Sequence, residues 1–340
     1  MNYDKLNRII KDFFNNKDYE SYLETMGNIK KLSEIFILNY NYINSSSGFN
    51  TEISLTDSID ISNSFFKSID KKYSKEFLRL LNSYGQYDGC VDASKTVEFT
   101  KISPLLINKF NRSGVTSDGK VYIDYCETVF DIFDICHEIV HRFSYKGYES
   151  LIKKYLGETT SILSELYLSD YLKDNTNINE EDINKYIIYR FNTAFDDAIS
   201  VYIQITLIEL YIKNGNVNEL ILTKYLDSLS KTDIYDRIYD KCISKVKNII
   251  KSDEMDFFIR QRYVIGLVCA LELKRQNSFK SFNKLVEIFG KDDSDIDNDI
   301  ATIQNIIPIF YDKSFSFDEN RVIKNINEKI KIIKNKKHYN

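Results

Sequence analysis

Glycine and proline are scarce in this sequence, which has only 11 glycines and 2 prolines among 340 residues. These two residues supply most of the tight turns that join short strands. Few segments here carry such turn signals, whereas leucine, isoleucine, lysine and glutamate are abundant. We therefore expect a mainly α fold.

The sequence also lacks a surplus of charge and any long apolar run. Its 46 basic and 50 acidic residues are interspersed and give a net charge of −4, so a nucleic-acid partner is not expected. Charges interrupt the first 14 residues, where a signal peptide needs an apolar core, and no run approaches the roughly 18 apolar residues of a membrane span. We expect a cytoplasmic protein without a membrane partner, and the oligomeric state stays open.

Paired cysteines are missing as well. The five cysteines include no CxxC pair, and their number is odd. A disulfide scaffold normally shows an even number of cysteines in a short secreted chain. Free buried thiols in a reducing compartment are the expected alternative.

Apolar residues at helical spacing dominate the first 80 residues. They predict helices at Leu6–Phe14, Tyr22–Leu38 and Ser64–Leu81, with the polar stretch Asn44–Asn50 between the last two. We interpret residues 1–82 as a helical N-terminal region. Residues 83–340 are then expected to form a catalytic domain whose C-terminal part is mostly helical.

The pattern changes between residues 85 and 125, where Thr96–Thr100 and Lys120–Tyr125 have strand-like composition. A small β-sheet is expected here. The second strand could offer a free edge to an extended peptide, or it could belong to an ordinary structural hairpin.

Helical spacing returns at Val129–Arg142. A second helix is predicted to begin near Glu158 and to run to about Leu172. A third is predicted to start at Asn177–Glu180, where the two end residues have the spacing of a capping box.

The first of these helices contains the pentapeptide HEIVH, formed by His137 to His141. Two histidines four residues apart on a helix lie on one face, one turn above the other, so both rings can reach one metal ion. Glu138 lies beside them, where it can act as the general base for the attacking water. Two of the three histidines of the chain fall in this motif, which argues against a chance match.

A catalytic zinc site needs a third protein ligand. The next helix carries Glu158 and Glu165, whose spacing of seven residues puts both carboxylates on one face. One could bind the metal while the other holds a ligand histidine. Spacing alone leaves the choice open.

Two segments resemble the active-site region of the oligoendopeptidase F and thimet oligopeptidase family. They are KVYIDYCETVFDIFDICHEIVHRF and GETTSILSELYLSDYL, and a weaker resemblance at RYVIGLVCALEL extends the match over roughly residues 85–275. The resemblance implies a helical zincin-like metallopeptidase of the gluzincin type, with one zinc ion per chain. It also implies that His137, His141 and Glu158 are the zinc ligands, that Ser161 is the small polar residue after the ligand glutamate, and that Glu165 supports the ligands.

The sequence departs from the family pattern at several positions. Val140 stands where glycine is usual, and Arg142 adds a charge. The N-terminal region is shorter than in the family. The family's C-terminal histidine, which stabilises the oxyanion, is missing, and Tyr263 is the nearest candidate for that role. Tyr263 could equally be a core aromatic residue.

Asp134, one turn before His137, could accept a hydrogen bond from a ligand imidazole, or it could lie on the helix surface. The predicted function is zinc-dependent hydrolysis of peptide bonds in short unstructured peptides, with Glu138 as the general base. The alternative is a weakened homologue that binds peptides as a scaffold.

Overall fold

The computed structural model is mainly α-helical with one small sheet, as the sequence predicts. It describes residues 1–15, 20–43, 49–82, 97–103, 113–116, 119–144, 151–276, 279–292, 296, 299–310 and 314–336. No helix within these ranges is both long enough and apolar enough to cross a membrane. The four cysteines in these ranges are buried free thiols, as expected, and Cys90 lies outside them.

The chain forms two compact units, each built from separate stretches of sequence. The first comprises residues 1–42, 192–268 and 307–340, and the second comprises residues 43–191 and 269–306. Helices α8 (Glu180–Asn214) and α11 (Phe257–Arg275) contribute to both units. The division at residue 82 that the sequence pattern suggested stays a prediction.

The first unit consists of helices in its described part. Helix α2 packs against α15, and α1 packs against α10. Asn28 on α2 donates a hydrogen bond of 2.9 Å to the backbone oxygen of Ser314. The helices are α1 (Tyr3–Asn15), α2 (Glu20–Asn39), the second part of α8 (Glu180–Asn214), α9 (Glu219–Leu229), α10 (Tyr235–Ser252), the first part of α11 (Phe257–Arg275) and α15 (Glu319–Lys336).

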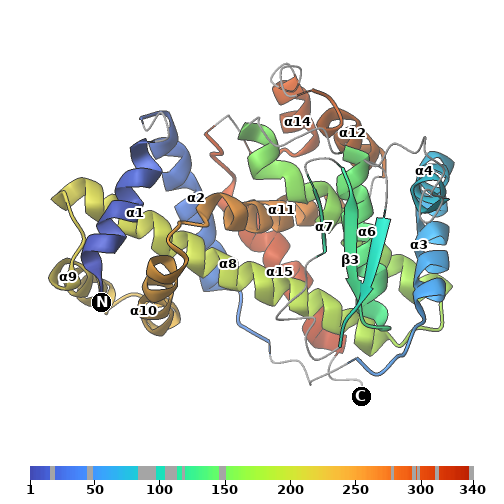
Figure 1. The fold of residues 1–340 in the computed structure, drawn as a ribbon, viewed down its shortest axis with the longest axis horizontal. Coiled ribbons are helices and arrows are strands. Elements are labelled where there is room, and N and C mark those ends of the chain that lie inside the picture. The colour runs from blue at the N-terminus through green and yellow to red at the C-terminus, as the bar shows by residue number, and fades with distance from the viewer. Residues whose placement is uncertain are drawn as a thin grey trace. The chain divides into compact units, whose positions relative to one another are not determined.

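The second unit contains the sheet (Figure 1) and all of the predicted site residues except Tyr263. In addition to parts of α8 and α11, its elements are α3 (Leu55–Ile69), α4 (Lys71–Asn82), β1 (Val97–Lys101), β2 (Gly114–Val115), β3 (Val121–Tyr125), α6 (Val129–Ser144), α7 (Leu151–Asn175), α12 (Phe279–Phe289) and α14 (Ile300–Ile306). Helix α6 packs closely against α7, α3 and β3. Buried aromatic residues fill the core between these elements, among them Phe65, Phe66, Phe77, Phe130 and Phe133.

The described strands form a sheet in the order β1-β3-β2, with β1 parallel and β2 antiparallel to β3. Strand β3 pairs with β1 along its whole length and with β2 at Val121 and Tyr122. The idea that Lys120–Tyr125 offers a free edge to a peptide is therefore wrong, because β3 is the central strand. The following helix, α6, packs against this central strand.

Two predicted helices need correction. The segment Ser64–Leu81 is not one helix, because α3 ends at Ile69 and α4 starts at Lys71, with Asp70 in an extended conformation between them. Helix α7 begins at Leu151 and not near Glu158, since burial of its apolar residues outweighs the cost of Gly157 inside the helix, about 1 kcal/mol.

The N-terminus of α8 lies where the sequence predicts it, but a different residue caps it. The backbone N–H of Glu181 donates to Oδ1 of Asn179 at 2.9 Å, so Asn179 and not Asn177 provides the cap. The capping-box spacing pointed to Asn177, but the residue directly before the helix, Asn179, is the one whose side chain accepts the hydrogen bond.

Candidate metal centre

The start of α6 is fixed by one buried carboxylate. Asp131 lies in the first turn and accepts hydrogen bonds from the backbone N–H of Cys126 at 2.9 Å and of Thr128 at 3.2 Å. A negative charge is favourable at a helix N-terminus, where backbone N–H groups lack helical partners. This contact ties the end of β3 to the helix that carries the HEIVH motif.

Helix α6 is buried almost all round, and its motif residues lie inside the second unit. His137, Glu138 and His141 expose only 4%, 7% and 6% of their surface. The two imidazoles are one helical turn apart, and their Nε2 atoms are 3.1 Å from each other. Because such polar groups are costly to bury without partners, the arrangement needs a ligand or a proton between the two rings.

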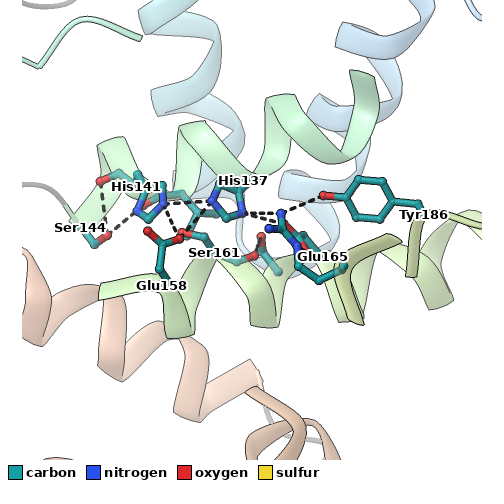
Figure 2. A network of polar contacts seen from close by, with 10 residues as sticks. His137, His141, Ser144, Glu158, Ser161, Glu165 and Tyr186 are labelled. Carbon is teal, nitrogen blue, oxygen red and sulfur yellow. Dashed lines mark hydrogen bonds and ion pairs between the residues drawn. The ribbon is translucent and has the colours of Figure 1, made fainter. Parts of the chain in front are cut away.

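Glu158 on α7 completes the group. Its Oε2 atom lies 3.1 Å from Nε2 of His141 and 3.2 Å from Nε2 of His137. The three atoms thus form a nearly equilateral triangle (Figure 2). A tetrahedral zinc ion with bonds of about 2.0–2.1 Å holds its ligand atoms about 3.3 Å apart, so the residues fit one such ion.

The described residues contain one cluster of this kind that could hold a metal ion, namely His137, His141 and Glu158. Of the two carboxylates that spacing had left open, Glu158 is the one that converges with both Nε2 atoms. Glu165 is fully buried about two turns further along α7, and it contacts the other side of His137.

The contact between Glu165 and His137 is short. Nδ1 of the imidazole lies 2.6 Å from Oε1 of the carboxylate. An ionised carboxylate only accepts hydrogen bonds, so Nδ1 must carry the proton that it donates. The lone pair of Nε2 in the neutral ring then faces His141 and Glu158, as a metal ligand requires.

Arg190 was not predicted from the sequence. It lies on the part of α8 that belongs to the second unit, and its Nε donates to Oε2 of Glu165 at 2.8 Å. Its Nη2 donates both to Oε1 of Glu165 and to the hydroxyl of Tyr186, the latter at 3.1 Å. The signal in the sequence was one basic residue within the apolar run YIIYRF, which does not reveal which acid it meets.

Burial and neighbouring charges shift the pKa values of the site. Burial raises the pKa of Glu138 to about 8, the nearby positive charge of His137 opposes this, and the acids Asp134 and Glu158 add to it. Burial alone would lower the pKa of His137, but hydrogen bonds to Glu158 and Glu165 raise it to about 10. Burial tends to raise the pKa of Glu165, but the charge of Arg190 and the hydrogen bond with His137 keep it below its usual value.

These shifts describe the site without a cation. A carboxyl group whose pKa lies near neutrality can both accept and release a proton, which suits a general acid-base role for Glu138. The raised pKa of His137 reflects an acidic neighbour at each ring nitrogen, Glu165 at Nδ1 and Glu158 at Nε2. A cation at the ligand triangle would take the place of the proton between Nε2 and Glu158 and leave the contact of Nδ1 with Glu165 in place.

The remaining predicted residues lie in three different settings. Asp134 is buried on α6 and helps to raise the pKa of Glu138; its bond to a ligand imidazole stays a prediction, since Nδ1 of His137 bonds to Glu165. Ser161 is fully buried on α7 between the two glutamates, and its hydroxyl has no hydrogen-bond partner in the described part of the chain (Figure 2). Tyr263 lies on α11 in the first unit, with the guanidinium of Arg262 5.4 Å from its ring centre.

No protein-family profile matches this sequence, and neither does any curated protein. One solved structure is similar in fold: the crystal structure of a candidate peptidase from Chlamydophila abortus, with a TM-score of 0.57 and 15% sequence identity. The similarity covers 94% of this chain but 56% of that protein's chain, so this chain spans little more than half of its neighbour's length. At this identity the likeness concerns the fold.

Proposed function

We propose that this protein is a zinc-dependent peptidase related to the oligoendopeptidases. The observation that carries the proposal is the triangle formed by Nε2 of His137, Nε2 of His141 and Oε2 of Glu158, with sides of 3.1–3.2 Å, beside the buried Glu138. A fold neighbour that is itself a candidate peptidase supports it.

The donor set favours zinc over harder cations. Two imidazole nitrogens and one carboxylate oxygen are a ligand set of catalytic zinc sites, whereas calcium and magnesium prefer oxygen ligands alone. A bound zinc ion supplies Lewis acidity, which polarises a peptide carbonyl and lowers the pKa of a water molecule to about 7. We expect one ion per chain.

Glu138 is the proposed general base. It follows His137 directly on α6 but is not part of the ligand triangle, so its carboxylate is available for protons. Its role is to take a proton from the attacking water and to pass it to the leaving amine. The positive charge of a cation at the triangle would lower its pKa and keep it ionised for the first of these steps.

The substrate class rests on the resemblance to the oligopeptidases, which implies short unstructured peptides. Tyr263 is the proposed donor to the oxyanion that forms on the scissile carbonyl. This part of the proposal is separable, because the ligand triangle and Glu138 do not depend on Tyr263.

A second candidate function is peptide binding without efficient turnover. It is favoured by one feature of the sequence: no histidine lies between His141 and His338, so the family's oxyanion histidine has no counterpart there. The two candidates share the metal site and differ in the rate of hydrolysis.

Hydrolysis of quenched fluorescent peptides by the zinc-loaded protein tests the proposal. We expect Glu138→Gln to lower the rate by at least about 100-fold while zinc remains bound. The matched control is Glu287→Gln on α12, which removes an exposed carboxylate and should leave the rate unchanged. Zinc binding without any hydrolysis would favour the second candidate, and an unchanged rate in Glu138→Gln would contradict the role of Glu138.

A further inference from the structure

The guanidinium of Arg190 donates hydrogen bonds to the carboxylate of Glu165 from two of its nitrogens. Its Nε donates to Oε2 at 2.8 Å, and its Nη2 donates to Oε1, so the planar group meets both oxygens of the carboxylate. The side chain of Arg190 is only 12% exposed and that of Glu165 is fully buried. A two-point contact of this kind fixes the orientation of a carboxylate as well as its charge.

Arg190 is itself held in place by contacts that lead back to α6. Its Nη2 donates to the hydroxyl of Tyr186 at 3.1 Å, one turn earlier on α8. The ring of Tyr186 is stacked on that of Phe133, with centres 3.8 Å apart and planes at 8°. Phe133 lies one turn before His137 on α6, so α6, α8 and α7 form a closed ring of contacts around Glu165.

The same carboxylate holds His137 (Figure 2). Oε1 of Glu165 receives both Nη2 of Arg190 and Nδ1 of His137, the latter at 2.6 Å. Nη2 also approaches Nδ1 at 3.4 Å, but the contact of Nδ1 with the carboxylate is much shorter and decides where its proton points. With the proton on Nδ1, Nε2 presents a lone pair to the ligand triangle.

We propose that Arg190 is a positioning residue for the metal site. It fixes the orientation of Glu165 and, through Glu165, the ring plane and tautomer of His137, and it thereby sets the affinity of the site for zinc. The inference rests on the proposed metal site and adds to it the residue that tunes its affinity. Removing a partner that hydrogen-bonds the non-ligating nitrogen of a ligand histidine typically weakens metal binding about 10- to 100-fold.

A simpler role for Arg190 would be to neutralise the buried charge of Glu165. Lysine distinguishes the two roles, because an ammonium group keeps the positive charge but cannot meet both oxygens of a carboxylate in one plane. If neutralisation alone matters, Arg190→Lys should bind zinc as tightly as the wild type. If orientation matters, it should bind zinc more weakly.

The test measures zinc affinity of the full-length protein by competition with a chromophoric chelator. We expect Arg190→Lys to weaken zinc binding about 10- to 100-fold and Arg190→Met to weaken it at least as much. The control is Arg275→Lys, because Arg275 also pairs with a fully buried glutamate, Glu272, at 3.1 Å. The control should retain wild-type affinity.

A second readout follows the hydrogen bond itself, at saturating zinc. The chain has only three histidines, so the imidazole signals of protein labelled with ¹⁵N-histidine can be assigned by single substitutions. The Nδ1 proton of His137 should exchange slowly with water in the wild type and at least tenfold faster in Arg190→Lys. Unchanged exchange and unchanged zinc affinity in Arg190→Lys would overturn the inference, whereas failure of the wild type to bind zinc would instead contradict the proposed function.

Discussion

Nε2 of His141 and Oε2 of Glu158 lie 3.1 Å apart, although the residues belong to different helices and are separated by 17 positions in the chain. Both side chains are almost completely buried. Without a cation or a shared proton between them, a buried carboxylate and a ring nitrogen at this distance would lose their hydration without gaining a compensating interaction. The contact therefore makes the stability of the second unit depend on what lies between the two atoms.

Zinc should accordingly stabilise the folded protein. A ligand that binds the native state at 100 times its dissociation constant adds about 2.7 kcal/mol to the free energy of unfolding. We expect the melting temperature of the chelator-treated protein to rise by several degrees on addition of zinc, and this rise to be largely lost in Glu158→Ala. Differential scanning calorimetry measures it, with Glu287→Ala as the control. An equal rise in Glu158→Ala would mean that zinc binds elsewhere.

The pH dependence of stability should reveal the buried carboxyl of Glu138. Burial raises its pKa from 4.5 to about 8, so the folded chain holds this proton more tightly than the unfolded chain does. The resulting stabilisation is complete below the unfolded pKa and is lost as the pH rises through about 8. Glutamine is neutral at every pH and does not lose it.

Metal-free Glu138→Gln should therefore melt at a higher temperature than metal-free wild type at about pH 8.5, with a smaller gap at about pH 5. Thermal unfolding followed by circular dichroism in excess chelator measures the gap. A difference that stays constant between these pH values would show that the carboxyl of Glu138 is not perturbed by burial.

Phe133 joins α6 to α8 through its stacking on Tyr186. Because its side chain is fully buried, Phe133→Ala should lower the free energy of unfolding by about 3–5 kcal/mol, as measured by urea denaturation. Leu78→Ala, at a position that is 42% exposed on α4, should change it by less than about 1 kcal/mol. Similar effects of the two substitutions would argue against this packing of α6 on α8.

The local part of the site could be predicted from the sequence because it lies within one helix. The HEIVH motif places His137 and His141 on one face of α6, since helical periodicity fixes the relation of residues four apart. Periodicity on α7 left Glu158 and Glu165 equivalent, and the family resemblance implied Glu158 as the ligand. The packing of α7 on α6 supplies the physical difference: one carboxylate reaches both Nε2 atoms and the other reaches Nδ1.

Long-range relationships could not be predicted in the same way. Arg190 meets Glu165 across 25 positions of sequence, and no local pattern encodes that distance. The central place of β3 in its sheet likewise depends on pairing with β1 and β2, whereas strand composition alone is the same for a central strand and an edge strand.

X-ray absorption spectroscopy of the zinc-loaded protein, with zinc and protein quantified in the same sample, examines the ligand triangle itself. The account predicts one zinc ion per chain with nitrogen and oxygen neighbours at about 2.0–2.2 Å, a signature of imidazole coordination in the outer scattering, and loss of stoichiometric zinc in His141→Ala. Purified protein that takes up no stoichiometric zinc, or zinc whose surroundings are unchanged in His141→Ala, would contradict it.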